Sequence, residues 1–137
     1  HSFGGLFVLY TLFHQPTQFQ HYVAGSPSLW WGNGAILPTT RPLLSHTPQS
    51  ITITLGQYEE NPEADPERKH LSPEVLAQKD ARRGDLTFRQ LHTMLAAEAP
   101  NSQIIIYEGK NHGSSINQFL MEAFNTASGN TAKPSPH

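Results

Sequence analysis

The stretch that decides the fold is HSFGGLFVLYTLF, residues 1–13, in which a serine and two adjacent glycines precede a long apolar run. Apolar side chains cover most of the circumference of a helix expected over residues 4–14, so we predict that this helix is enclosed. Pro16 ends it, because proline disfavours the helical conformation in the residue before it. A serine immediately before such a helix is typical of a strained strand-to-helix turn that presents a nucleophilic hydroxyl above a sheet.

The two glycines support this interpretation of Ser2. The motif of such a turn is G-x-S-x-G, and Ser2-Phe3-Gly4 supplies its second part, with the first glycine expected before His1. The turn packs its backbone tightly, so a side chain at Gly4 or Gly5 should strike its neighbours. The turn should also splay the His1 side chain away from the serine. The competing interpretation is that HS is the remnant of an affinity tag and that SxGG is a common pattern.

The backbone N–H of Phe3 directly follows the serine at the start of the predicted helix. It would point at an oxyanion that develops beside Ser2, and the helix dipole favours negative charge at the same place. Phe3 is therefore the predicted oxyanion donor.

Other segments predict alternating strands and helices. Strands are expected over residues 19–25, 50–55 and 103–108, and helices over 35–45, 72–83, 87–99 and 115–125. The isoleucine run of the last strand suggests burial on both faces. This alternation predicts an α/β fold with parallel strands. Three strands are too few for such a sheet, so its upstream strands are expected to be missing. Residues 1–125 are the predicted domain and residues 126–137 a disordered tail.

His112 is the predicted general base among eight histidines. A nucleophilic serine needs a base, and in the serine hydrolases with this turn the chain order is serine, acid, histidine. His112 alone follows a predicted strand end, lies between Gly109 and Gly113, and comes late in the chain. The other histidines are expected to be surface, packing or tail residues.

The acid should follow an earlier strand, and SITITLGQYEENPEAD offers four carboxylates after residue 55. The first ones beyond the strand end are the best placed, because later ones move away with the loop. Glu59 is the predicted acid and Glu60 the alternative. The competing interpretation is that each is a solvated loop carboxylate.

Composition excludes several other functions. The net charge of −2 gives no reason to expect nucleic acid or a membrane surface as partner, and no apolar stretch is long enough to span a membrane. The chain has no cysteine, and no histidines lie at ligand spacing on a predicted helix, so no metal site is expected. The glycines near residue 33 lack the lysine of a phosphate-binding loop. We expect no cofactor.

Four ordered segments, HSFGGLFVLY, AGSPSLWW, GQYEE and GKNHGSS, together resemble an esterase family of the α/β-hydrolase superfamily. This family includes enterochelin, feruloyl and S-formylglutathione-type esterases, and the similarity is strongest to the siderophore-esterase-like branch. The resemblance covers residues 1–125, as the C-terminal half of an α/β-hydrolase beginning at the nucleophile elbow. In the family, several further strands and a second oxyanion amide come from upstream.

The resemblance implies roles for individual positions. Ser2 matches the family's nucleophile, His112 its base and Glu59 its usual acid, although some relatives lack that acid and act through a serine–histidine dyad. A loop beside the family's active site matches the five residues Ser26, Pro27, Ser28, Leu29 and Trp30, and Trp31 directly follows them. The two tryptophans would stack on an aromatic acyl group or, alternatively, pack under the elbow.

The implied function is a serine carboxylic ester hydrolase for siderophore or aryl esters, acting through a Ser-His-Glu triad. The alternatives are a catalytically inactive fragment of such a hydrolase, an acyltransferase with the same triad, and a binding module built on residues 57–85. The expected partners are a small-molecule ester and either the missing N-terminal half or a second copy of the chain. The resemblance points to the bacterial cytoplasm or periplasm.

Overall fold

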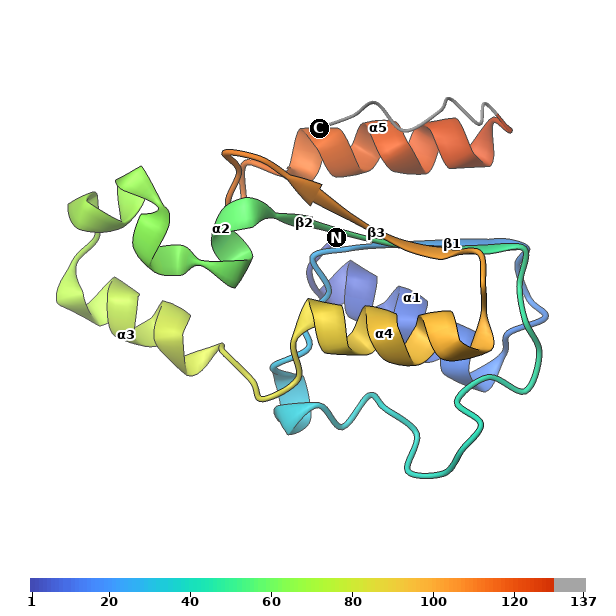
Figure 1. The fold of residues 1–137 in the computed structure, drawn as a ribbon. Helices are drawn as coiled ribbons and strands as arrows, with labels where there is room; N and C mark the ends of the chain where they lie inside the picture. The colour runs from blue at the N-terminus through green and yellow to red at the C-terminus, as the bar shows by residue number, and fades with distance from the viewer. Residues whose placement is uncertain (130–137) are drawn as a thin grey trace.

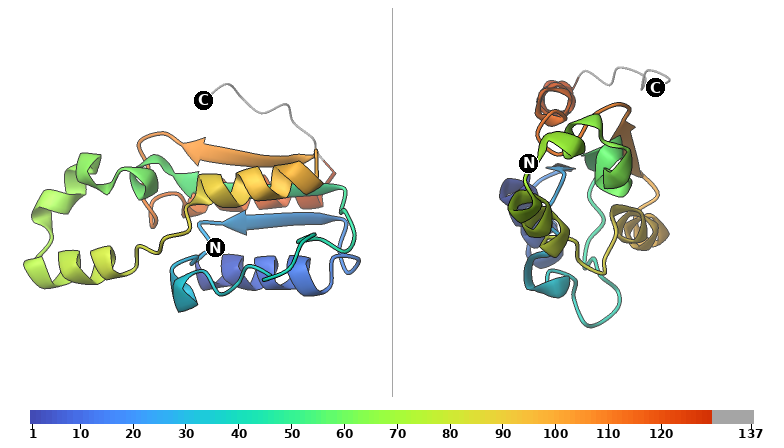
Figure 2. Two further views of the ribbon diagram at one scale, coloured as in Figure 1. Left: turned by 60° about the horizontal axis from the view of Figure 1, so that its bottom comes forward. Right: turned by 90° about the vertical axis from the view of Figure 1, so that its left-hand side faces the viewer.

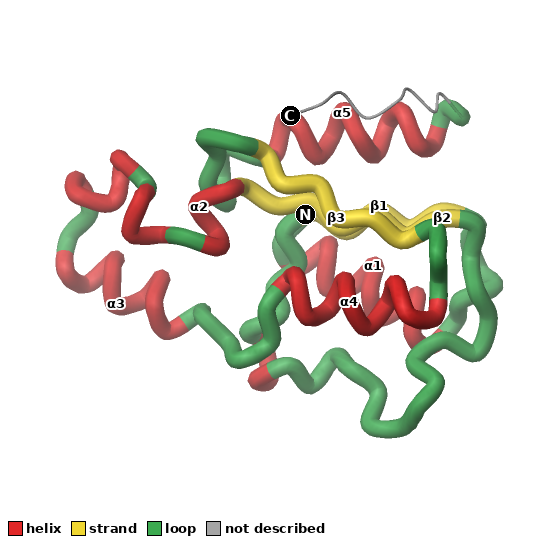
Figure 3. The backbone as a smooth tube through the Cα atoms, viewed as in Figure 1, coloured by secondary structure: helices red, strands yellow, loops and turns green. Residues whose placement is uncertain are grey.

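A three-stranded parallel sheet forms the centre of the molecule in the computed structural model, which describes residues 1–129. Its strands are β1 (His21–Gly25), β2 (Ser50–Gly56) and β3 (Ser102–Tyr107), arranged in the order β1-β2-β3. Helices lie on both faces, with α1 and α4 on one side and α5 on the other (Figures 1 and 3). The predicted α/β class with parallel strands is confirmed.

Four helices follow the expected boundaries within a few residues: α1 (Phe3–His14), α3 (Pro73–Ala81), α4 (Phe88–Glu98) and α5 (Ile116–Ala127). The one-turn helix α2 (Gln57–Glu60) was not expected, and three short 3₁₀ turns complete the helical segments of the described residues. Ser72 caps α3 by accepting the Val75 N–H, with Pro73 in the first turn as predicted. Thr87 and Gln90 form a reciprocal capping box at the start of α4.

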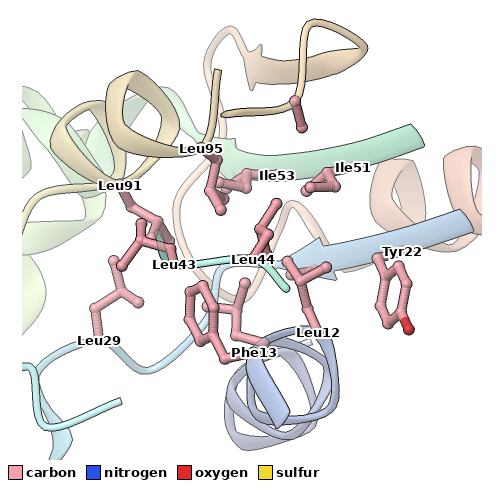
Figure 4. Packing of buried hydrophobic residues seen from close by; sticks show 13 residues of the cluster. Leu12, Phe13, Tyr22, Leu29, Leu43, Leu44, Ile51, Ile53, Leu91 and Leu95 are labelled. Carbon is pink, nitrogen blue, oxygen red and sulfur yellow. The ribbon is translucent and has the colours of Figure 1, made fainter. Parts of the chain in front are cut away.

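The hydrophobic core lies between the sheet and the pair α1 and α4 (Figure 4). Alternate residues of β2 point to this side, and Ile51 and Ile53 are almost fully buried there. Leu12 comes from α1 and Leu95 from α4, and neither is exposed to solvent. This layer anchors the sheet and the start of α1, which carry the candidate site.

The helix expected over residues 35–45 is absent, and that prediction was wrong. The segment runs as an irregular loop in which Leu43 and Leu44 are buried. Their backbone N–H groups donate to the two carboxylate oxygens of Glu98, at 2.9 and 2.8 Å. Pro38 and Pro42 have no N–H to donate to a helix, so a contact from α4 satisfies this backbone instead.

Two burial predictions were also wrong. On α1, which we expected to be enclosed, Phe3, Phe7 and Tyr10 are 55%, 69% and 52% exposed. The isoleucines of β3, which we expected to be buried on both faces, are only partly buried. β3 is the last strand in order, and α5 packs over β1 instead.

The C-terminal tail was expected to begin at residue 126, but α5 continues to Ala127. The tail's residues 130–137 lie outside the described part of the chain. Within residues 1–129, no helix combines the length and the apolar character that a membrane span requires.

Candidate active site

Three loops meet at the carboxyl edge of the sheet. β1, β2 and β3 are parallel and end at Gly25, Gly56 and Tyr107, so the loops after them share one edge. The N-terminus lies beside the β1 arrowhead at this edge (Figure 2). The fold therefore brings together Ser2, Glu59 and His112, which are far apart in the sequence.

Ser2 occupies a strained turn. Its φ of 59° and ψ of −122° lie outside the regions that non-glycine residues ordinarily adopt, and α1 begins at the next residue. The Ser2 N–H donates to the Gly25 carbonyl oxygen at 2.8 Å, which fixes the turn at the end of β1. This geometry is that of the strand-to-helix turn that the sequence predicted.

The two glycines after Ser2 differ in their surroundings. A Cβ added at Gly5 would lie 2.7 Å from the Gly25 oxygen and 3.0 Å from the Pro27 Cα. No described atom would come within 4 Å of a Cβ added at Gly4. The predicted steric clash is therefore confirmed for Gly5. For Gly4 the prediction was wrong, since no atom of residues 1–129 would meet its side chain.

The His112 imidazole lies between the other two side chains. Its Nε2 is 3.2 Å from Ser2 Oγ, and its Nδ1 is 2.7 Å from Glu59 Oε1. A carboxylate only accepts hydrogen bonds, so Nδ1 carries the proton and Nε2 is left to accept from the serine hydroxyl. The side chain of His112 is 45% exposed and that of Glu59 only 10%, so the ring is accessible while its acid is shielded.

The environments of Glu59 and Glu60 distinguish the two candidate acids. Glu59 reaches His112, whereas Glu60 turns away and receives two hydrogen bonds from the Arg89 guanidinium, at 2.6 and 3.1 Å. Glu59 is the third residue of the one-turn helix α2, and its Oε2 accepts the Gly56 N–H at 2.7 Å. This capping contact holds the carboxylate against the end of β2.

The loop that carries His112 is held against the end of β2. The Tyr58 N–H donates to the Lys110 oxygen at 2.9 Å, and the Gly109 N–H donates to Gln57 Oε1 at 2.8 Å. A Cβ at Gly56 would strike the backbone oxygens of Lys110 and Asn111. The backbone of the His112 loop approaches Gly56 so closely that only glycine fits at this position. This close packing brings the loop within reach of Glu59, which follows Gly56 by three residues.

Phe3, the expected oxyanion donor, is the first residue of α1, and its N–H has no hydrogen-bond partner within residues 1–129. Such a group at a helix N-terminus is available to an anion. No group of three or more potential metal-ligating side chains lies together in the described part of the chain.

Two of the three expected pocket residues, Ser28 and Trp30, lie beside Ser2 or its neighbour Phe3. Ser28 is 4% exposed and its Oγ is 3.4 Å from Ser2 Oγ. Trp30 packs edge-on against Phe3, with ring centroids 5.7 Å apart, and the Arg82 guanidinium lies 5.5 Å from its ring. Trp31 is 54% exposed, so one tryptophan packs beside the elbow and the other faces solvent.

Sequence reasoning missed two neighbours of the site. The His1 ring was expected to point away, but its centroid is 4.7 Å from that of His112. Ser26, which the resemblance placed in the loop beside the active site without a role of its own, donates to Glu59 Oε2 at 2.7 Å. The position of Ser26 directly after β1 was a usable signal, since the other two strands end at the same site.

Three curated proteins show what the chain is similar to. It is 51% identical over 45 residues to the siderophore enterobactin esterase of Emericella nidulans, covering 33% of this chain and 15% of that protein. It is 29% identical over 131 residues to the siderophore triacetylfusarinine C esterase of Aspergillus fumigatus, covering 83% and 42%. It is 42% identical over 66 residues to the ferri-bacillibactin esterase BesA of Bacillus subtilis, covering 44% and 23%. The homologues of this chain are siderophore esterases.

Solved structures of such enzymes agree with this relationship. Siderophore hydrolase EstA from Aspergillus nidulans superposes with a TM-score of 0.72 at 27% identity, covering 96% of this chain and 48% of EstA. Siderophore hydrolase EstB from the same organism gives a TM-score of 0.71 at 27% identity, covering 92% and 45%. The α/β-hydrolase type of fold and the resemblance to siderophore esterases are confirmed. No protein-family model matches the chain.

The chain spans less than half the length of the siderophore esterases that it matches. The activity and substrates of those complete enzymes are therefore proposals for this chain.

Proposed function

We propose that this chain carries the nucleophile, base and acid of a serine ester hydrolase that cleaves siderophore esters. The observation that supports this most directly is the continuous contact from Ser2 Oγ to His112 Nε2 at 3.2 Å and from His112 Nδ1 to Glu59 Oε1 at 2.7 Å. The strained Ser2 backbone at a helix start adds to it, because this conformation exposes the hydroxyl.

In the first half of the reaction, Ser2 Oγ attacks the ester carbonyl carbon as His112 Nε2 accepts the hydroxyl proton. Glu59 holds the Nδ1 proton and stabilises the imidazolium that forms. When the tetrahedral intermediate collapses, the carbon–oxygen bond to the leaving alcohol breaks. His112 donates its proton to that alcohol, which leaves an acyl group on Ser2.

In the second half, a water molecule takes the place of the alcohol. His112 accepts a proton from the water as the water oxygen attacks the acyl carbon, and it returns that proton to Ser2 Oγ as the acid leaves. The net change is one ester and one water converted to one acid and one alcohol. The serine and the imidazole end as they began.

The negative oxygen of each tetrahedral intermediate needs hydrogen-bond donors. The N–H of Phe3 at the start of α1, which has no partner within residues 1–129, is suited to supply one of them. In the family that the sequence resembles, the second donor comes from a loop upstream of the nucleophile. Removal of one such donor typically lowers the rate by about a hundredfold or more.

The proposed substrate class rests on the relatives, which are named as esterases of enterobactin, triacetylfusarinine C and ferri-bacillibactin. Aryl esters are the simpler alternative substrates. The aromatic pair of Phe3 and Trp30, which packs edge-on directly after Ser2, suits an aromatic acyl group in either class.

The length of the match favours a second candidate, an inactive piece of such a hydrolase. The chain covers 42% of the triacetylfusarinine C esterase and 48% of EstA. Activity would then require an N-terminal half like that of the family that the sequence resembles. Such a half would pack beside β1, which pairs only with β2 among the described residues.

The test measures hydrolysis of p-nitrophenyl acetate and of a ferric triester siderophore by the full-length protein and by residues 1–137 alone. Ser2→Ala should lower the full-length rate by roughly 10⁴-fold or more, because it removes the nucleophile. Ser128→Ala is the matched control and should keep the wild-type rate, since the Ser128 hydroxyl donates to the Asn125 oxygen at the end of α5.

Three outcomes discriminate the alternatives. Wild-type hydrolysis by Ser2→Ala contradicts the proposal. Activity in the full-length protein but not in residues 1–137 identifies the shorter chain as an inactive piece. Formation of a new ester when an alcohol acceptor is added, detected by mass spectrometry, identifies an acyltransferase.

A further inference from the structure

The Glu59 carboxylate is held on the side opposite His112. Its Oε1 contacts His112 Nδ1, while its Oε2 accepts two hydrogen bonds, from the Gly56 N–H and from Ser26 Oγ, both at 2.7 Å. The Gly56 donor is a backbone N–H group, which a substitution at position 56 other than proline would not remove. Of the two donors, only the Ser26 hydroxyl belongs to a side chain. The two contacts on Oε2 fix the rotation of the carboxylate and leave Oε1 aimed at the imidazole.

Ser26 is buried in a backbone conformation that a serine does not favour. It is 1% exposed, and its φ of 40° lies in the left-handed region, where glycine is preferred. Its N–H donates to the Thr54 oxygen of β2 at 2.7 Å. A glycine would satisfy the same backbone without the steric cost, so conformation alone does not account for a serine here.

The loop that contains Ser26 also contacts the nucleophile. The Ser2 N–H donates to the Gly25 oxygen at 2.8 Å, and the Ser28 N–H donates to the Ser2 oxygen at 3.2 Å. Residues 25–28 therefore hold the backbone of Ser2 on one side and the side chain of Glu59 on the other. A shift of this loop would change both ends of the serine–histidine–glutamate contact.

We propose that the Ser26 hydroxyl is a positioning group that holds Glu59 in the orientation needed by His112. The inference rests on the proposed esterase function. It makes Ser26 a residue that acts through Glu59 and does not touch the substrate.

The test compares Ser26→Gly and Ser26→Ala in the full-length protein. Both remove the hydroxyl, but glycine also relieves the positive φ, so Ser26→Gly should fold more stably than Ser26→Ala. We expect kcat to fall roughly ten- to a hundredfold in both variants with KM little changed, because a small displacement of a catalytic group has effects of this size. A wild-type kcat in Ser26→Gly, beside a strongly reduced kcat in Glu59→Ala, overturns the inference and leaves the esterase proposal intact.

A double-mutant cycle tests whether Ser26 acts through Glu59. Ser26→Gly should lower kcat in the wild-type background and cause no further loss in the Glu59→Ala background. Equal losses in both backgrounds would mean a general structural role and overturn the inference. A wild-type kcat in Glu59→Ala would overturn the inference together with the triad proposed for the esterase.

A spectroscopic measurement supplies a readout independent of turnover. The proton on His112 Nδ1 that is bound to Glu59 should give a far-downfield resonance in the proton NMR spectrum. It should weaken or move in Ser26→Gly and stay in place in Ser102→Ala. Ser102 is the matched control, since its hydroxyl donates to the Ala99 oxygen at 2.8 Å at the other end of β3. An unmoved resonance in Ser26→Gly contradicts the proposal.

Discussion

Two neighbouring glutamates show how much depends on the surroundings of a single residue. Glu59 is shielded and contacts His112, whereas Glu60 forms an exposed ion pair with Arg89. We expect Glu59→Ala to lower kcat roughly a hundredfold or more, because the imidazole loses the group that orients it. Glu60→Ala should stay within about a factor of two of the wild type, since exposed ion pairs contribute little. Steady-state kinetics on one ester substrate compares the two, and equal losses would contradict the assignment.

At the residue scale, chain order and strand ends were sufficient to predict that Ser2, Glu59 and His112 would lie together. Distance from the strand end favoured Glu59 over Glu60, but the pairing of Glu60 with Arg89 from α4 leaves no signal in the sequence. The contacts of His1 and Ser26 depend on backbone rotations. Ser2 and Ser26 both have positive φ, which redirects the chain in a way that residue type does not reveal.

At the element scale, the turn between the start of the chain and α1 depends on one glycine more than on its neighbour. Gly5→Ala should destabilise the protein by about 1–3 kcal/mol, because its Cβ would meet backbone atoms of Gly25 and Pro27. Gly4→Ala is the matched control and should leave the melting temperature unchanged or raise it, since alanine favours a helix. Thermal unfolding followed by circular dichroism measures both, and equal melting temperatures would contradict the packing of the turn.

The contact between β3 and α5 should make stability sensitive to alkaline pH. Burial, with a smaller contribution from Glu122, raises the pKa of Tyr107 from 10.0 to about 12, and its hydroxyl donates to the Gln118 oxygen. The folded state thus favours the neutral phenol. Its stabilising contribution is complete below pH 10 and is lost as the pH rises towards 12.

Urea unfolding at pH 8 and pH 11 tests this dependence against a variant without the hydroxyl. The wild type should lose stability relative to Tyr107→Phe between the two pH values, by an amount on the order of 1–2 kcal/mol. Tyr10→Phe, at a half-exposed position on α1, is the control and should follow the wild type. A constant difference between wild type and Tyr107→Phe would contradict the prediction.

The elements that the sequence predicted well are those decided by local pattern. The residue spacing of α4, the cap of α3 and the β-branched run of β2 each depend on nearby residues. The loop over residues 35–45 was misjudged because its backbone donors are satisfied by Glu98, more than fifty positions later. A contact of that range leaves no periodic signal in the segment itself.

At the scale of the whole molecule, two apolar surfaces are open to solvent on opposite faces of the sheet. On α1 they comprise Phe3, Phe7 and Tyr10, and on α5 Leu120, Met121 and Phe124, each more than half exposed. Both helices pack against β1, which pairs only with β2 among the described residues. The two burial errors have different causes. The expected enclosure of α1 required a further layer that the described residues do not supply, whereas β3 is the last strand in order and α5 packs over β1 instead.

These surfaces should make residues 1–137 associate when the chain is produced alone. We expect light scattering to show oligomers that grow with concentration, because exposed apolar area and an unpaired strand edge both favour association. Substituting Phe7→Glu and Phe124→Glu together should reduce association, whereas Lys69→Glu and Lys79→Glu, on the segment between α2 and α4, should have little effect. A monomeric wild-type chain over the same concentrations would contradict this expectation.

Glu59 stands only three positions after the last residue of β2, and the chain does not re-enter the sheet layers until α4. The stretch from α3 to the start of α4 reaches the site through Arg82, whose guanidinium lies 5.5 Å from the Trp30 ring. A change in its length or composition should therefore reshape the approach to the serine without displacing the carboxylate.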